Sequence, residues 1–257
     1  MSAATLALHQ FRYDQKTFWR NPASVFFTAL LPVIFLLIFA TIFGNDVIDS
    51  LGGVKTTTYY VPAIITLAVV SATTQSLAIS LAIDRENGLL KRTRGTPLPS
   101  SVFIAGRVGN ATVVSVLSLI LLAAIGRIVY GVEIPWERLP AVLVTLAVGA
   151  AAFCCLGFAL TAAIPNQDAA APISNAALLP LYFLSGVFIP ENEIPDDVLK
   201  VADFFPIRHF FEAFFSAWNP ATSGPGFEWG HLGIVAAWGA LGLLIAVLTF
   251  RWEPRSR

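Results

Sequence analysis

The chain has 257 residues, of which 56% are hydrophobic and only 12% are charged, and its mean hydropathy is +0.72. Soluble domains carry about 25% charged residues, so this composition excludes an ordinary soluble protein and favours an integral membrane protein. The formal net charge is zero, and a chain so balanced gives no indication of a nucleic-acid partner.

The first segment, 4–20, has mixed polarity and precedes the first apolar run. Leu8, Phe11, Phe18 and Trp19 fall on one side of a helix, and the basic residues lie largely elsewhere. This pattern is typical of an amphipathic helix that lies along the inner membrane surface. An ordinary soluble lead-in is the alternative.

Six continuous apolar runs follow, and a helix needs about 20 apolar residues to cross a bilayer. Backbone polar groups must be paired in lipid, and runs that are continuous rather than alternating favour helices over a barrel. The predicted spans are about 23–44, 60–83, 108–129, 139–164, 170–189 and 231–250. We therefore expect an all-α membrane protein in which residues 1–257 form one membrane domain.

The basic residues predict the orientation of these spans. An even number of spans places both termini on one side, and cytoplasmic loops are enriched in Lys and Arg. That side holds eleven of the sixteen basic residues, namely Arg12, Lys16, Arg20, Arg85, Lys91, Arg92, Arg94, Arg107, Arg251, Arg255 and Arg257. We expect both termini to be cytoplasmic.

A compact charged segment, "DRENGLLKRTRGTPLPS" at 84–100, connects the second and third spans. Acidic residues come first and basic residues follow, an order that suits the dipole of a short helix, and Pro97 and Pro99 would end that helix. An ordinary positive-inside loop explains the charge but not this order.

Two spans carry a mildly polar face. The candidates for a translocation path are Thr66, Thr73, Ser76 and Ser80 in the second span and Ser174, Asn175, Tyr182 and Ser185 in the fifth. Small hydroxyl residues also hold membrane helices together. Path lining and simple packing therefore both remain open for these eight residues.

The segment between the fifth and sixth spans, about 190–230, holds an aromatic stripe that begins after Pro206. Phe210, Phe211, Phe214, Phe215 and Trp218 recur at helical spacing. We expect an outer re-entrant hairpin of two short helices, with Phe210, Phe211 and Phe214 as an outer gate. A surface loop that covers the bundle is the alternative.

Several classes of site are missing. None of the six spans contains an acidic residue, which argues against ion coupling, although unwound backbone carbonyls can also bind sodium. A GxxxxGK[ST] motif is absent, so the chain cannot hydrolyse nucleotide alone. His9, His209 and His231 are scattered and predict no metal site. We expect no catalytic residue and no bound cofactor.

Two stretches resemble the type-2 ABC transporter permeases. "DRENGLLKRTRGTPLPS" is similar to the first cytoplasmic loop of that family, and "LYFLSGVFIPENEIPDDVLKVADFFPIRHFFEAF", residues 181–214, is similar to its fifth span and outer hairpin. The order of six spans and the amphipathic start also agree. One departure from the pattern of the family is "FFPIRHF". Pro206 matches the proline of the family, but the residues beside it differ, and the roles of Arg208 and His209 are open.

The resemblance implies a permease that pairs with a second permease chain, identical or related, and with two separate ATPase subunits that hold ATP and Mg. Segment 84–101 would be the cytoplasmic coupling helix, with Leu89 and Leu90 buried against the ATPase and charged ends setting the register. The residues implied in ATPase coupling are Asp84, Arg85, Glu86, Gly88, Leu89, Leu90, Arg92 and Thr93.

The leading hypothesis is a permease subunit, in the cytoplasmic membrane, of an ABC exporter for a hydrophobic small molecule, drug or lipid. Within the same family, a permease for lipid-linked polysaccharide is the alternative. An ion-coupled secondary transporter or channel and a non-transporting membrane scaffold or enzyme are the remaining hypotheses.

Overall fold

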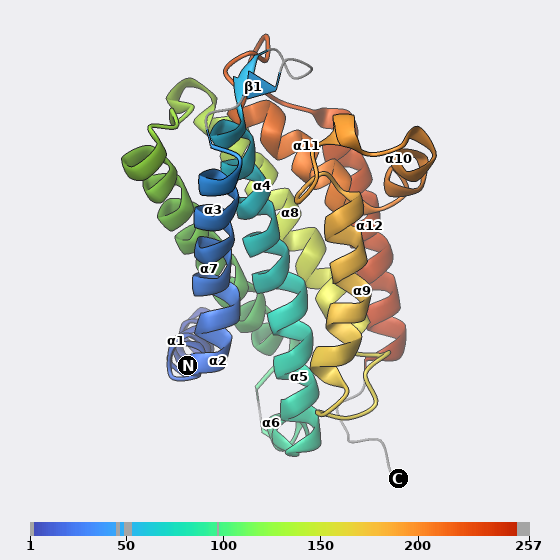
Figure 1. Ribbon diagram of the computed structural model, residues 1–257. Coiled ribbons are helices and arrows are strands. Elements are labelled where there is room, and N and C mark those ends of the chain that lie inside the picture. The colour runs from blue at the N-terminus through green and yellow to red at the C-terminus, as the bar shows by residue number, and fades with distance from the viewer. Residues whose placement is uncertain (1–2, 45–46, 49–52, 97, 251–257) are drawn as a thin grey trace.

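The computed structural model describes residues 3–44, 47–48, 53–96 and 98–250, which form an elongated bundle of helices (Figure 1). The elements of the first part are α1 (Ala3–Trp19), α2 (Pro22–Val25), η1 (Phe26–Leu30), α3 (Leu31–Ile42), β1 (Val47–Ile48), β2 (Val54–Lys55), α4 (Thr56–Val70), η3 (Ser71–Gln75), α5 (Ser76–Glu86) and α6 (Leu89–Arg94). β1 and β2 pair antiparallel, with Val47 opposite Lys55. Apart from these two short strands, the regular elements described are helical, as the composition predicts.

The second part of the chain completes the bundle. Its elements are α7 (Ser100–Tyr130), η4 (Trp136–Arg138), α8 (Leu139–Leu160), α9 (Ala170–Leu184), η5 (Glu191–Glu193), α10 (Asp196–Ala202), α11 (Pro206–Trp218) and α12 (Trp229–Thr249). We call the end of the bundle that carries α10 the hairpin end and the opposite end the α6 end (Figure 1). α1 and the last turn of α12 lie at the α6 end.

Five helical stretches of the described residues are long and apolar enough to cross a membrane. They are Pro22–Ile42, Thr56–Glu86, Ser101–Tyr130, Trp136–Leu160 and Trp229–Thr249. These agree with five of the expected spans, although the second and third run several residues beyond the expected 60–83 and 108–129. Exposed apolar residues such as Leu37, Ile38, Leu244 and Val247 cover the outside of the first and last of these helices, a surface suited to lipid.

In the remaining expected span, 170–189, the helix is shorter than the apolar run of the sequence. α9 has 15 residues, which correspond to about 22 Å of helix, against about 30 Å of hydrocarbon. The helix ends at Leu184 because Gly186 adopts a left-handed conformation, with φ +83°. The helix therefore ends before the expected span does, and a sixth crossing stays a prediction.

α4 occupies the centre of the bundle. Every residue of this helix except Thr58 is buried, and it packs against α3, α7, α8 and α11. α4 continues through η3 into α5 without a break. η3 is a π-helical segment, as is η1 in the first span, and the two are in contact. π-Segments inside α-helices often occur at functional sites.

Small residues bring α8 close to its neighbours. A Cβ atom on Gly239 of α12 would lie 2.7 Å from the Cα of Ala152, and one on Gly149 would lie 2.1 Å from a ring carbon of Phe210. The Ala and Gly residues of α8 therefore allow close helix packing.

The N-terminal helix forms as expected, but its apolar side is divided. Phe18 is buried and Phe11 lies against Gly109 of α7, whereas Leu8 and Trp19 are exposed. Part of the apolar side therefore holds α1 on α7, and only the rest is available to a membrane surface. Placement of α1 along that surface stays a prediction.

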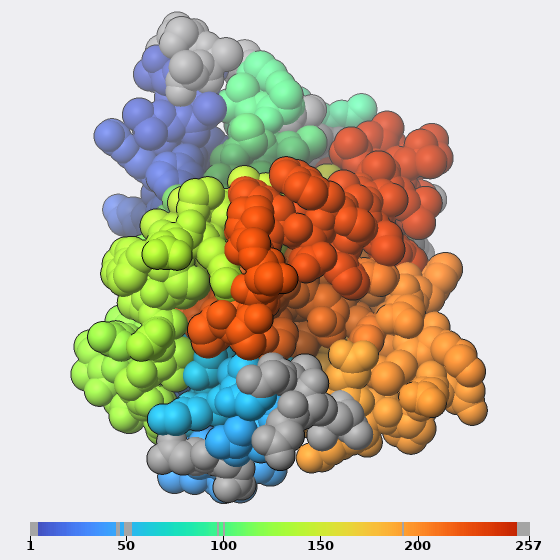
Figure 2. All heavy atoms as spheres, turned by 90° about the horizontal axis from the view of Figure 1, so that it is seen from above, coloured from blue at the N-terminus to red at the C-terminus, as the bar shows by residue number. Residues whose placement is uncertain are grey.

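The two short helices of the expected outer hairpin are also present. α10 lies at the edge of the molecule (Figure 1), whereas α11 packs against α4, α8, α9 and α12. Viewed onto the hairpin end (Figure 2), orange atoms around α10 form one edge and the orange-red connection from α11 to α12 crosses the middle. The aromatic stripe of α11 thus contacts other helices of the same chain.

Candidate functional site

The charged segment forms a short helix at the α6 end, as expected. Gly88, with φ +70°, makes the turn between α5 and the six-residue helix α6. Within α6, Arg92 is exposed, and the Thr93 hydroxyl donates to the carbonyl of Leu89 at 2.9 Å.

The two leucines of α6 face opposite ways. Leu89 is 42% exposed, but Leu90 is 1% exposed and packs among Leu77, Leu81 and Phe103. Leu90 therefore fills the permease's own core and, in this conformation, is not available to an ATPase. The implied docking role of Leu90 does not fit this placement.

Asp84, Arg85 and Glu86 also contact their own chain. Asp84 pairs with Arg107 of α7. Arg85 is 4% exposed and donates to the carbonyls of Thr161 and Ile164, and Glu86 accepts from the backbone N–H of Gln167. These contacts were not expected from a role in docking.

The polar faces of the second and fifth spans meet. The hydroxyls of Ser71 and Tyr182 lie 3.3 Å apart, and the Gln75 amide donates to Asn175 at 2.6 Å. Sequence analysis missed Ser71 and Gln75 of η3, because at regular helical spacing both fall on the side of the helix opposite to Thr73. Gln75 carries the one side-chain amide in the expected span 60–83, a signal that could have identified it.

The other candidate path residues bond locally or not at all. The hydroxyls of Thr73, Ser80 and Ser185 donate to carbonyls three or four residues earlier, and Ser76 is half-buried. Thr66 and Ser174 are fully buried, and their hydroxyls have no hydrogen-bond partner among the described residues. The meeting faces form a wall that carries hydroxyls and amides but no charge.

The three candidate gate residues are packed into the hairpin end. Phe210, Phe211 and Phe214 are each at most 1% exposed. The ring of Phe211 lies 5.4 Å from that of Tyr59, and the ring of Phe210 lies 5.3 Å from that of Phe153. The Tyr59 hydroxyl also donates to the carbonyl of Gly186. These contacts close the hairpin end around α4.

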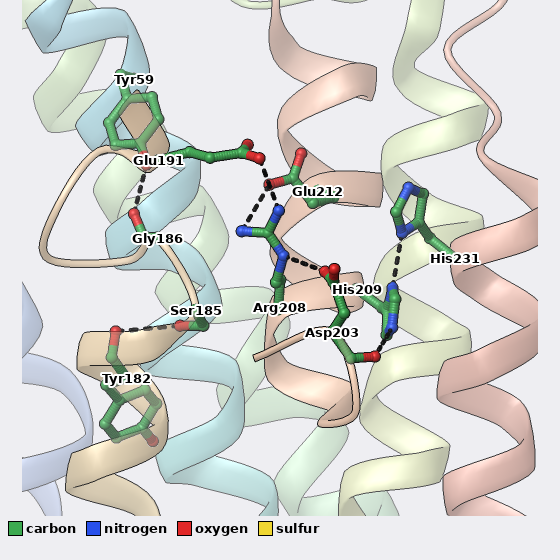
Figure 3. A network of polar contacts seen from close by, with 10 residues as sticks. All are labelled: Tyr59, Tyr182, Ser185, Gly186, Glu191, Asp203, Arg208, His209, Glu212 and His231. Carbon is green, nitrogen blue, oxygen red and sulfur yellow. Dashed lines mark hydrogen bonds and ion pairs between the residues drawn. The ribbon is translucent and has the colours of Figure 1, made fainter. Parts of the chain in front are cut away.

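An ionic network joins η5 and the end of α10 to α11 (Figure 3). Arg208 bonds the carboxylates of Glu191 at 2.7 Å and Asp203 at 2.6 Å, and Glu212 lies 3.9 Å from it. Burial raises the pKa of Glu212 to about 7, and the charge of Glu191 adds to this effect, while Arg208 opposes it. Arg208, whose role the sequence left open, thus anchors the hairpin.

Two histidines that are 22 residues apart in the sequence meet in the same network. His209 and His231 are joined through their Nδ1 atoms at 2.8 Å, and His209 Nε2 lies 2.7 Å from the carbonyl of Asp203. A carbonyl can only accept, so Nε2 of a neutral His209 donates and its Nδ1 accepts from His231. The description of the histidines as scattered was wrong, although no group of three or more His, Cys, Asp or Glu in the described part of the chain could hold a metal ion.

Comparison with known proteins identifies the family of the chain. The ABC-2 type transporter family matches residues 8–218, from α1 to the end of α11. YvfS of Bacillus subtilis (strain 168), which is named as a transport permease, is 24% identical over 234 residues, or 91% of this chain and 92% of YvfS. With its five long apolar helices, the chain is a multi-pass membrane protein and belongs to the ABC-2 type transporter family.

Proposed function

We propose that this chain is the permease subunit of an ATP-driven exporter and that two separate ATPase subunits supply the energy. The observation that carries this proposal is α6, a basic helix at the tip of the bundle between two long apolar helices. Leu89 is exposed beside Lys91, Arg92 and Arg94. An exposed leucine beside basic residues forms a surface suited to contact with a protein partner.

The orientation follows from the same end of the molecule. α1 lies at the α6 end (Figure 1); it carries exposed Arg12 and Lys16, and exposed Arg20 follows it directly. We propose that this end is cytoplasmic, that both termini lie there, and that the chain forms one domain in the cytoplasmic membrane. The hairpin end is then the outer end, and α9 completes six crossings.

The wall between the second span and α9 supports an uncharged cargo. Gln75 with Asn175 and Ser71 with Tyr182 offer amides and hydroxyls, and the buried hydroxyls of Thr66 and Ser174 have no partner among the described residues. A charged polymer would require side chains of the opposite charge along its path, and this wall carries none. We propose a hydrophobic small molecule, drug or lipid as the substrate, with a second permease chain completing the path.

The test is purification of the tagged chain from native membranes and identification of the proteins that accompany it. An ABC ATPase at about one copy per permease is expected, and Leu89→Asp should abolish its recovery. Val201→Asp is a matched control, because Val201 is also an exposed apolar residue but lies on α10 at the opposite end. Recovery of the permease without any ATPase would contradict the proposal and favour an ion-coupled transporter or a scaffold.

A further inference from the structure

The residues just before α6, Asp84, Arg85 and Glu86, form three contacts with three different parts of the chain. We refer to them as the 84–86 segment. Arg85 is 4% exposed, Asp84 is half-buried and Glu86 is exposed, and each of the three bonds another part of the chain. A buried arginine is costly unless its donors are satisfied, so the geometry of its partners indicates its role.

Arg85 binds the end of α8. α8 ends at Leu160, and Thr161 and Ile164 lie in the turn that follows it. Arg85 donates from Nη1 to the carbonyl of Thr161 at 3.1 Å and from Nη2 to that of Ile164 at 2.5 Å. A positive charge at this position also interacts favourably with the negative end of the helix dipole. Arg85 thus holds the turn that follows α8.

Glu86 binds the approach to α9. Its carboxylate accepts from the backbone N–H of Gln167, three residues before α9 begins at Ala170. A negative charge near the beginning of a helix is again the favourable sign. Adjacent residues of opposite charge therefore hold the two sides of the α8–α9 turn, each with the charge that suits its helix end.

Asp84 ties the same segment to the other side of the bundle. It pairs with Arg107 of α7, and Arg107 Nε lies 3.6 Å from the carboxylate of Asp14 in α1. Burial raises the pKa of Asp14, an effect that the charge of Arg107 opposes. The segment is thus connected to α1 and α7 as well as to the α8–α9 turn.

α6 is joined to this segment by a short link and by the packing of Leu90. Only Asn87 and Gly88 separate Glu86 from Leu89, and Leu90 packs on Leu77 and Leu81 of α5 and Phe103 of α7. A force applied to the exposed side of α6 therefore reaches the 84–86 segment, and through it the turn that leads into α9. α9 carries Asn175 and Tyr182 of the polar wall.

We infer that Arg85 and Glu86 are positioning residues that transmit a displacement of α6 to the α8–α9 turn, and that they do not contact the ATPase. This inference rests on the proposed function. It divides the residues implied in ATPase coupling into two groups. Leu89 and Arg92 bind the partner, whereas Arg85 and Glu86 carry the motion into the membrane.

The test uses the complete complex and follows α9 directly, so it requires no knowledge of the substrate. A cysteine replaces the exposed Ala176 of α9 in a background in which Cys154 and Cys155 are alanine. The rate of maleimide labelling is compared with and without ATP. In the otherwise unchanged complex, ATP should alter this rate at least about fivefold, a typical allosteric coupling.

In Arg85→Gln and in Glu86→Ala, the labelling rate should be about the same with and without ATP. The ATPase should still co-purify at the wild-type ratio. Arg85→Lys should retain part of the effect, because lysine can still donate to one carbonyl. Arg92→Gln is the matched control on the exposed side of α6, and it should weaken co-purification instead. Glu86 is exposed, so Glu86→Ala remains informative if Arg85→Gln does not fold.

Loss of the ATPase in Glu86→Ala to the same extent as in Arg92→Gln would overturn the inference, as would an unchanged ATP effect. Failure of the ATPase to accompany the wild-type chain would instead overturn the proposed function, and with it this inference. The two failures are therefore distinguishable by the co-purification step alone.

Discussion

At the scale of single residues, the hairpin end holds a cluster of charged side chains centred on Arg208. Arg208 is surrounded by Glu191, Asp203 and Glu212, so one positive charge faces three carboxyl groups (Figure 3). Arg208 forms ion pairs with the two nearest carboxylates, those of Glu191 and Asp203. Burial lowers its pKa, but the hydrogen bonds to Glu191 and Asp203 outweigh this effect and raise the pKa overall. Glu212 is the carboxyl group left to take up a proton.

The stability of the protein should therefore depend on pH through Glu212. Its pKa in the folded chain, about 7, is above the ordinary value of 4.5, so the folded state holds a proton that the unfolded state has lost between these values. The stabilisation is fully present below about pH 4.5 and is lost as the pH rises through 7. Glu212→Gln should remove this loss, on the order of 1–3 kcal/mol.

The measurement is thermal unfolding of the purified protein from pH 5 to pH 8, compared between wild type and variant. Glu193→Gln is the matched control, because Glu193 is exposed in the same hairpin. A pH dependence that is equal in wild type and Glu212→Gln would show that Glu212 does not titrate in this range.

At the scale of elements, the second span and α9 are held together by polar contacts that cross the interface. The Gln75–Asn175 bond joins residues 100 positions apart, and the Ser71–Tyr182 contact lies one or two turns farther along. Hydrogen bonds between membrane helices are each worth roughly 0.6–2 kcal/mol. Two such contacts can break and re-form when the helices move, which suits a path that opens and closes.

A double-mutant cycle with Gln75→Ala and Asn175→Ala tests this interface. The two amides are direct partners. The sum of the stability losses of the two single variants should therefore exceed the stability loss of the double variant by roughly 0.5–1.5 kcal/mol. The measurement is unfolding in detergent of all four proteins. Strict additivity would mean that the two side chains do not interact. A cycle of Gln75→Ala with Thr112→Ala, which lies in α7 and bonds Val108, is the control expected to be additive.

Close packing of α8 on α11 gives a further prediction. A Cβ on Gly149 would overlap the Phe210 ring at 2.1 Å, and that ring cannot move aside easily because Phe153 and Phe214 flank it. Gly149→Ala should therefore destabilise the protein by roughly 1–3 kcal/mol. Gly230→Ala is the control, because a Cβ there meets nothing within 4 Å. Equal unfolding temperatures for the two variants would contradict the close contact.

At the scale of the whole molecule, the open question is how many times the chain crosses the bilayer. Five helices are long enough, and α9, with 15 residues, can cross only together with the non-helical residues that follow it. Ser185–Phe188 are all buried, and Tyr59 bonds the Gly186 carbonyl. Non-helical backbone is tolerated in a membrane when protein encloses it, so a short helix with a buried extension is sufficient.

Cysteine labelling at exposed positions on either side of α9 decides the count. In the cysteine-free background, a cysteine at Asn166 should be labelled from the cytoplasm only, and one at Asp197 from the outside only. The physical reason is that α9 and its extension separate the α6 end from the hairpin end. Labelling of both positions from one side would show that α9 does not cross, and would leave five spans.

The sequence by itself determined that the chain is a bundle of membrane helices, because the length and polarity of an apolar run are local properties. It also determined the short helix after Gly88, since acidic residues, basic residues and two prolines follow one another within a few residues. The order of the polar and apolar faces along the second span followed in the same way. Ser71 and Gln75 of η3 were missed because, at regular helical spacing, they fall on the side opposite to the predicted polar face.

Only the tertiary structure decided which side chains meet. Leu89 and Leu90 are adjacent and chemically identical, and only the packing of Leu77 and Phe103 distinguishes the buried one from the exposed one. His209 with His231, Arg85 with the end of α8, and Gln75 with Asn175 are pairings between distant segments. A side-chain period defines a face within one helix, whereas the partner of that face depends on how the helices pack.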